Sequence, residues 1–169
     1  DTLLSVGEED LYQPLWSEVI LDETLRTLKT IHPGKNPNSF EARVASMGSA
    51  FPNACVQGWS SLEPGLADYW PDPNDAHVVA AAIRGRAEII VTSNLKHFPE
   101  RLLDEHGLHA ASPDKFLSDL LDLNESSVLD AVRKQADRTN NPSLGMPEIA
   151  GSLSQIAPVF AENLLARLT

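Results

Sequence analysis

Acidic, hydroxyl and amide side chains flank a short apolar segment between residues 70 and 94. Asp72 and Asp75 precede an Ala- and Val-rich run, and Thr92 and Asn94 follow the triplet Ile-Ile-Val. Carboxylate and carbonyl oxygens are the ligands that Mg²⁺ and Mn²⁺ prefer. In open α/β sheets, ligands bind beyond the carboxyl ends of strands. The pattern therefore predicts a divalent metal site between an acidic helix start and a polar strand end.

Each of these residues also has an ordinary structural explanation. Asp72 or Asn74 can cap a helix, and Asp75 in the first turn interacts favourably with the helix dipole. Asn94 can cap the helix that follows it. Taken one at a time, these structural explanations are at least as good as the functional ones, so both stay open at this point.

Glu23 is a third candidate acid. It lies inside an apolar pattern of helical spacing that starts after Ser17, a good N-cap, and ends before Pro33-Gly34. Either Glu23 or its neighbour Asp22 could face inward while the other faces solvent. A plain surface charge is the competing explanation for each.

The elements that must position these residues alternate between helix and strand up to about residue 111, and only helices follow. This pattern predicts an α/β domain at 1–111 and a helical C-terminal extension at 112–169. The unbroken triplet 89–91 is typical of a parallel strand buried on both faces. In the first part of the chain we expect the end of a helix within 1–11 and helices near 18–31, 39–51 (capped by Ser39), 74–85 and 99–105, with a turn at 63–65 and strands at 55–56, 88–92 and 108–110. In the C-terminal part we expect helices that start at Ser112-Pro113 and at Asn124 or Ser126, a short helix around Ile149 and a last helix over 153–168. A break in the helical pattern is expected at 140–142.

Composition narrows the class of protein. The 169 residues carry a net charge of −11 with a pI of about 4.7, which argues against a protein that coats nucleic acid through non-specific phosphate attraction. Cys55 is the only cysteine, which excludes an intrachain disulfide and a cysteine-based zinc site. No secretory signal and no apolar run long enough to span a bilayer is visible, so we expect a cytoplasmic protein without membrane contact.

Three blocks of sequence, taken together, resemble PIN-domain ribonucleases, and in particular the VapC-type toxins of bacterial toxin–antitoxin pairs. The resemblance extends over about residues 1–111, and the blocks occur in the family's order and at its spacing. They are residues 16–23 (WSEVILDE), 71–83 (PDPNDAHVVAAAI) and 90–99 (IVTSNLKHFP).

The resemblance implies an α/β/α sandwich with a central parallel sheet. It also implies a quartet of acidic or amide residues that binds Mg²⁺ or Mn²⁺. Glu23 matches the family's second acid, Asp75 the third, and Asn94 the fourth position. Thr92 matches a hydroxyl residue that shapes the site, and Asp72 is an auxiliary acid.

The chain departs from the family pattern at three places, one of which is Asn94, where an Asp is often found. The family's first metal-binding Asp ends an N-terminal strand, whereas this sequence opens at Asp1, inside what corresponds to the first helix. We therefore expect the first strand of the sheet to be absent from this chain. His97 stands where an acid is common, and it could approach the site from the loop after Asn94.

The function implied by the resemblance is metal-dependent hydrolysis of RNA phosphodiesters by the toxin of a type II pair. Glu23 and Asp75 would act as ligands or general bases. The expected partners are the RNA substrate and a protein antitoxin, with a homodimer as an alternative. The apolar stripes after Pro113 either pack on the nuclease domain or offer a docking surface for an antitoxin or a second copy. The candidates for contacts with the RNA backbone are Lys29, Lys35, Arg43, Arg84, Arg86 and Lys96.

Two other classes of protein are alternatives to the ribonuclease. A PIN fold that binds RNA or protein without cutting is favoured by the missing first Asp and by the charge of −11. A metal-dependent phosphatase of the acid-cluster type is disfavoured, because nothing here resembles the Asp-x-Asp nucleophile motif that such enzymes often use.

Overall fold

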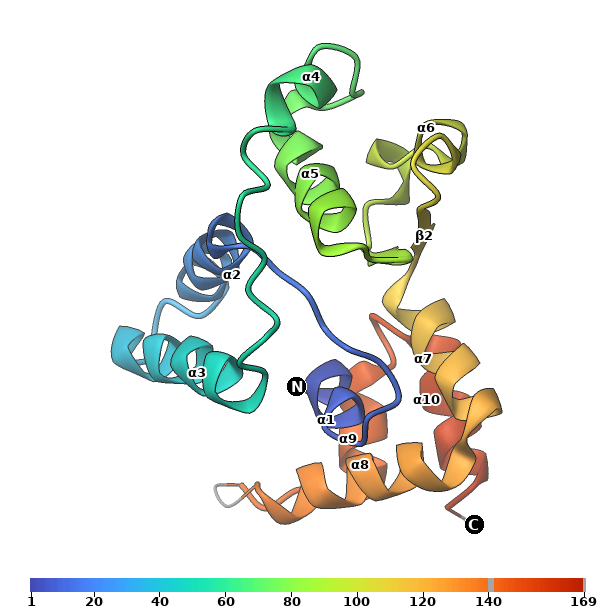
Figure 1. Cartoon of the computed structure of the whole chain (residues 1–169). Coiled ribbons are helices and arrows are strands. Elements are labelled where there is room, and N and C mark those ends of the chain that lie inside the picture. Colours follow the sequence, from blue (N-terminus) through green and yellow to red (C-terminus); the bar gives the residue numbers. More distant parts are fainter. Residues whose placement is uncertain (140–141, 169) are drawn as a thin grey trace. The chain divides into compact units, whose positions relative to one another are not determined.

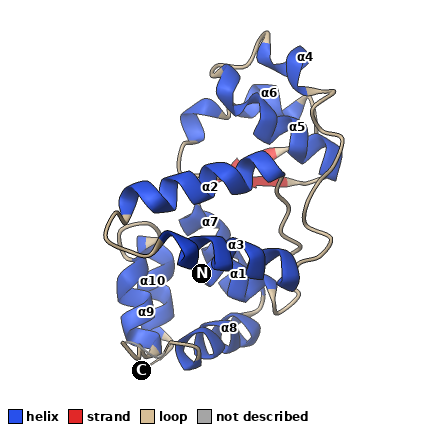
Figure 2. Cartoon of the chain, turned by 90° about the vertical axis from the view of Figure 1, so that its left-hand side faces the viewer, coloured by secondary structure: helices blue, strands red, loops and turns tan. Residues whose placement is uncertain are grey.

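Helices dominate the chain, and the two strands are short (Figures 1 and 2). The computed structural model describes residues 1–139 and 142–168. The elements are α1 (Thr2–Gly7), α2 (Glu18–Ile31), α3 (Pro37–Ala50), α4 (Glu63–Ala67), η1 (Pro73–Asp75), α5 (Ala76–Gly85), β1 (Ile89–Val91), η2 (Leu95–His97), α6 (Glu100–Asp104), β2 (His109–Ala111), α7 (Pro113–Leu123), α8 (Glu125–Asp137), α9 (Met146–Leu153) and α10 (Pro158–Ala166). None of the helices among these described residues is long and apolar enough to cross a bilayer.

The chain divides into two units, each with its own core. The first unit comprises residues 14–90 and 94–110. Its core forms around α5, whose small side chains at 76 and 79–82 are buried on most sides of the helix. Trp70, Phe98 and Leu103 complete this core. Alanine side chains let neighbouring backbones pack closely against α5. This buried helix positions the residues of the candidate site.

The second unit comprises residues 1–13, 91–93 and 111–169. Val6 of α1 is buried in the same cluster as Phe116, Val132 and Phe160 from the C-terminal helices. At the surface, Lys134 Nζ lies 2.6 Å from Glu9 Oε1. The N-terminal helix therefore packs with the C-terminal extension, and the sequence-based division at 111/112 stays a prediction.

The sheet is parallel and smaller than expected. His109 donates from its backbone N to Glu88 O at 2.9 Å, and Thr92 N donates to Ala111 O at 2.9 Å, so the pairing advances in the same direction along β1 and β2. The expectation of a strand buried on both faces is wrong for Ile89, which is exposed, whereas Ile90 is buried. The predicted α/β class, with a parallel sheet and C-terminal helices, is confirmed.

Several predicted helix starts are confirmed. The Ser17 hydroxyl accepts from Ile20 N at 3.2 Å at the start of α2. Ser112 caps α7 through Lys115 N at 3.1 Å, with Pro113 at the first helical position. These starts depend on hydrogen bonds within three residues, which is why the sequence predicts them.

Other predicted boundaries are wrong. Asn36, not Ser39, caps α3, because Pro37 fits the first helical position and places Asn36 before it. Residues 63–67 form the helix α4 instead of a turn. The helix expected at 153–168 is the end of α9 followed by α10, which starts at Pro158. At 55–56 the structure has one isolated parallel bridge between Trp16 and Cys55. The expected break at 140–142 includes residues 140 and 141, which lie outside the described ranges.

Candidate functional site

The turn before α5 fixes Asp72. Its Oδ1 accepts from Asn74 N at 3.0 Å, so Asp72 is the N-cap of η1, and Pro73 occupies the first helical position. The capping explanation is therefore correct for Asp72. Capping occupies one carboxylate oxygen, and the other, Oδ2, lies 3.5 Å from His97 Nδ1.

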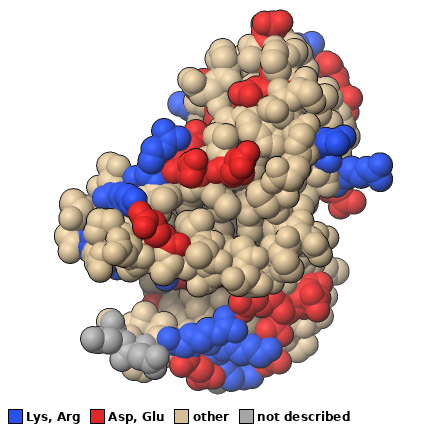
Figure 3. Space-filling model, turned by 60° about the vertical axis from the view of Figure 1, so that its left-hand side comes forward, with Lys and Arg blue, Asp and Glu red and all other residues tan. Residues whose placement is uncertain are grey.

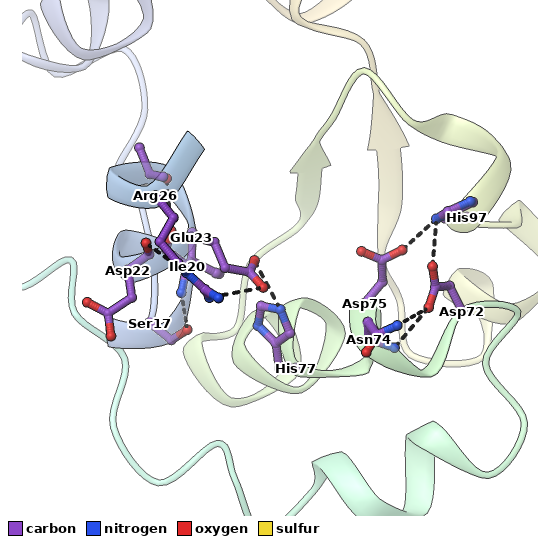
Figure 4. A network of polar contacts seen from close by, with 11 residues as sticks. Ser17, Ile20, Asp22, Glu23, Arg26, Asp72, Asn74, Asp75, His77 and His97 are labelled. Carbon is purple, nitrogen blue, oxygen red and sulfur yellow. Dashed lines mark hydrogen bonds and ion pairs between the residues drawn. The ribbon is translucent and has the colours of Figure 1, made fainter. Parts of the chain in front are cut away.

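Asp75 lies at the junction of η1 and α5, and its side chain makes no capping hydrogen bond. Its Oδ2 instead lies 2.7 Å from His97 Nδ1 (Figure 4). An ionised carboxylate can only accept, so His97 donates from Nδ1. The Asp75 carboxylate is thus held by a residue from η2, beyond the strand that follows α5.

Hydrogen bonds also hold the backbone of His97 close to the turn that carries Asp72. The buried Trp70 indole donates from Nε1 to His97 O at 2.9 Å, and His97 N donates to Asn94 O at 3.1 Å. As a result, one oxygen from each of Asp72 and Asp75 and one ring nitrogen of His97 lie within 4.8 Å of one another. All three side chains are partly exposed. This group, the Asp72–Asp75–His97 cluster, has the donors and the access that a metal ion requires.

Glu23 lies outside this cluster. It comes from α2, and its Oε2 lies 3.4 Å from Nε2 of His77 on α5. Its Oε1 lies 3.9 Å from Arg26 on its own helix. Figure 4 shows the two groups apart, with Glu23 and His77 on one side and the cluster on the other. The structure therefore pairs Asp75 with His97, and Glu23 with His77.

Asn94 and Thr92 follow β1, as expected from the sequence. Asn94 is the residue before η2, and its side chain makes no capping hydrogen bond there. Thr92 N continues the sheet by donating to Ala111 O. Their assignment to the metal site stays a prediction.

The sequence predicts that His97 could approach the site, but not that it is one of the site residues. The signal that could have found it was its position where an acid is common in the resembled family, three residues after Asn94. A nitrogen donor can take the place of a carboxylate as a metal ligand, although it suits different metals. The contact with Asp75 joins residues 22 apart, and no local pattern reports it.

The basic residues expected to bind RNA are only partly available for that role. Lys29 Nζ lies 2.8 Å from Glu41 Oε1 on α3, and Arg84 donates from Nε to Gln57 O at 3.4 Å. On the face shown in Figure 3, basic and acidic side chains lie interspersed.

The family model described as "PIN domain" matches residues 1–96, more than half of the chain. The chain belongs to the PIN domain family. The match contains Glu23, Asp72, Asp75, Thr92 and Asn94 and ends one residue before His97. The predicted family is thereby confirmed, together with the PIN-like fold.

Two further findings relate the PIN-domain chain to VapC proteins. A family model described as "VapC50 C-terminal domain" matches residues 113–166. A protein of Mycobacterium tuberculosis (strain ATCC 25618 / H37Rv), described as "Putative ribonuclease VapC50", is 41% identical over 104 residues, which are 62% of this chain and 60% of that protein. The chain thus matches about three fifths of that relative. No solved structure matches this chain significantly.

Proposed function

We propose that this chain is a metal-dependent endoribonuclease that hydrolyses RNA phosphodiesters, and that it acts as the toxin of a type II toxin–antitoxin pair. Membership of the PIN domain family and the description of the mycobacterial relative as a ribonuclease support the reaction class. The observation that carries the proposal is the Asp72–Asp75–His97 cluster at the start of α5.

The cluster fits a divalent cation. Two carboxylate oxygens are hard donors suited to Mg²⁺ or Mn²⁺, and an imidazole nitrogen suits Mn²⁺ better than Mg²⁺. Asp72 is held through its capping oxygen and presents the second oxygen, so its orientation is set before any ion arrives. Asp72, Asp75 and His97 would hold the ion, provided that the ligating ring nitrogen of His97 has transferred its proton to the other ring nitrogen or to water. Asn94 is a proposed further ligand through its amide oxygen. When bound, the cation supplies Lewis acidity and neutralises charge on the scissile phosphate.

The remaining residues supply proton transfer and orientation. Glu23 is the proposed general base, because its carboxylate lies outside the cluster and about half exposed, where it can accept a proton from water. Thr92 is proposed to orient the phosphate or the attacking water through its hydroxyl. Lys29, Lys35, Arg43, Arg84, Arg86 and Lys96 are proposed contacts to the RNA backbone.

The domain and partner assignments are part of the same proposal. We assign the nuclease to residues 1–111 and the helical extension to 112–169. The proposed partners are an RNA substrate and a protein antitoxin, with a homodimer as a further possibility. A cytoplasmic location fits this role and stays a prediction.

The test is RNA cleavage by the 169-residue chain in Mn²⁺ or Mg²⁺, with and without EDTA. Cleavage that EDTA abolishes and that Asp75→Asn reduces supports the proposal. The matched control is Asp104→Asn, since Asp104 also approaches a histidine, His109 at 3.9 Å, but belongs to no three-donor cluster within the described ranges. Absence of cleavage in both metals, or an Asp75→Asn variant as active as the control, contradicts it.

A non-cutting PIN module is the second candidate, and one observation favours it. Glu23 contacts His77 rather than the Asp72–Asp75–His97 cluster, so the acids are divided between two groups. This candidate predicts that RNA binds with equal affinity before and after EDTA treatment and is recovered intact. Gel-shift and cleavage assays on the same labelled RNA separate the two candidates.

A further inference from the structure

His77 is a polar residue in an apolar position. Its side chain lies in the core of the first unit, and the residue is 5% exposed. The neighbouring positions on α5 that share this burial are alanine or valine. Its Nδ1 atom is buried without a hydrogen-bond partner among the described residues. Burying an unpartnered polar nitrogen costs free energy, so packing alone does not explain a histidine here.

The contact of the other ring nitrogen, Nε2, explains why a histidine stands at position 77. Nε2 lies 3.4 Å from Glu23 Oε2 (Figure 4). The remaining charged neighbour of this carboxylate, Arg26, is largely exposed and 3.9 Å away on the same helix. Contacts between exposed charges are screened by water and contribute little. His77 is therefore the buried partner of Glu23.

The two partners differ in mobility. Glu23 is about half exposed, and α2, from which it extends, has no fully buried residue. An exposed glutamate has several rotamers available. The His77 ring is instead enclosed by the core and packs with the Trp59 ring at a centroid distance of 6.1 Å. An enclosed ring nitrogen 3.4 Å from a half-exposed carboxylate limits the orientations open to that carboxylate.

His77 and Asp75 are two residues apart, and this spacing decides which neighbour each side chain meets. Residues two apart at the start of a helix point to different sides. Accordingly, Asp75 is directed toward His97, and His77 toward Glu23. We infer that His77 is a positioning residue that holds the Glu23 carboxylate in a defined place relative to Asp75. This inference rests on the proposed function, in which Glu23 accepts a proton during RNA hydrolysis.

The kinetic test compares His77→Leu with His77→Gln in the 169-residue chain. Leucine keeps an apolar fill and removes the donor, whereas glutamine keeps an N–H donor near the position of Nε2. We expect His77→Leu to lower kcat about 10- to 100-fold, as for other residues that orient active-site ligands, with KM changed less than about twofold. Glutamine should restore most of the loss. Equal losses in both variants that follow a lowered melting temperature would indicate a structural role and overturn the inference.

A double mutant tests whether His77 acts through Glu23. Adding His77→Leu to Glu23→Gln should lower kcat no further, because the group that His77 positions is already gone. Multiplicative losses would show that His77 acts elsewhere, and would overturn the inference while leaving the ribonuclease intact.

A measurement independent of activity completes the test. The ring ¹⁵N resonances of His77 report which nitrogen carries the proton. We expect the proton on Nε2 and a change in that resonance in Glu23→Ala, while His109, which is exposed and beside Asp104, serves as the internal control. A His77 spectrum unchanged by Glu23→Ala overturns the inference even if the chain cleaves RNA. A changed spectrum in a chain that cleaves nothing supports the contact and rejects the proposed function.

Discussion

The Nδ1 atom of His97 lies 2.7 Å from Oδ2 of Asp75, so an imidazole and a carboxylate 22 residues apart share one hydrogen bond. The nitrogen also lies 3.5 Å from Asp72 Oδ2. Three donors that face one another in this way can hold a cation, and the nature of the third donor affects which cation is preferred.

Replacing the third donor should change the metal preference. In His97→Asp, three carboxylates would lie together, which repel one another without an ion and favour Mg²⁺ when it binds. We expect a lower melting temperature without metal and a larger rise on adding Mg²⁺ than in the wild type. His109→Asp adds the same charge beside Asp104 without a third donor, and is the control. An identical Mg²⁺ response in all three proteins would exclude His97 from the site.

Asp72 combines capping and metal binding, and two substitutions separate them. Asn can still accept from Asn74 N, whereas Ala cannot. We expect Asp72→Ala to lower the free energy of unfolding by about 1 kcal/mol, and Asp72→Asn to lower it by much less. Both should weaken Mn²⁺ binding, measured by calorimetry, because each removes the negative charge. Full Mn²⁺ affinity in Asp72→Asn would show that this carboxylate only caps.

Local signals in the sequence predict helix starts in both units, but not the long-range contacts of the candidate site. The Ser17 and Ser112 caps and the Asp72–Asn74 turn depend on neighbours within three residues, so side-chain chemistry and spacing define them. The contacts of Glu23 with His77 and of Asp75 with His97 join separate elements. They depend on how α2 and η2 pack on α5, which periodicity does not determine.

The packing of α1 and the shape of the sheet were hard to predict for the same physical reason. Val6 lies in a core formed by C-terminal helices more than a hundred residues away, and apolar spacing gives no partner for a helix. Ile89-Ile90-Val91 is apolar throughout, yet only Ile90 is buried, because a two-stranded sheet leaves positions of its edge uncovered. Asp75 and Glu23 were separate candidates from residue type and spacing, and only the resemblance assigned them to one site.

Two helical glycines allow a matched test of packing around α5. A Cβ added to Gly85 would meet Val56 Cγ2 at 2.8 Å and Leu15 Cδ1 at 3.0 Å, whereas a Cβ at Gly48 meets nothing within 4 Å. We expect Gly85→Ala to lower the free energy of unfolding by about 1–3 kcal/mol through overpacking. Gly48→Ala should raise it by about 0.5–1 kcal/mol through reduced entropy of the unfolded chain. Urea unfolding of both variants checks the signs. If both substitutions raise the free energy of unfolding, the Val56 side chain moves away from the added Cβ without loss of stability, which contradicts overpacking at Gly85.

Tyr12 gives the second unit a dependence on alkaline pH. Its hydroxyl donates to Leu3 O at 2.7 Å, and burial raises the pKa of the phenol well above its usual value. Because the folded state holds the proton more tightly, the stabilisation is fully present below the ordinary pKa of about 10 and is lost as pH rises beyond it. Tyr12→Phe should cost about 1 kcal/mol at neutral pH, by loss of the hydrogen bond, and should weaken the fall in stability above pH 10.

The exposed Tyr69 is the control for this experiment. Its hydroxyl contacts His106 at 3.1 Å at the surface of the other unit. Tyr69→Phe should leave both the neutral stability and its alkaline dependence close to those of the wild type. Equal alkaline loss in wild type and Tyr12→Phe would contradict the assignment of that dependence to Tyr12.

The most direct test of the proposed metal site is the position of Mn²⁺ in crystals of the 169-residue chain, located by anomalous scattering. We expect one peak in contact with carboxylate oxygens of Asp72 and Asp75 and with a ring nitrogen of His97, and no such peak in Asp75→Asn crystals. Mn²⁺ bound only elsewhere, or a peak at the same place in the Asp75→Asn variant with unchanged occupancy, would contradict it.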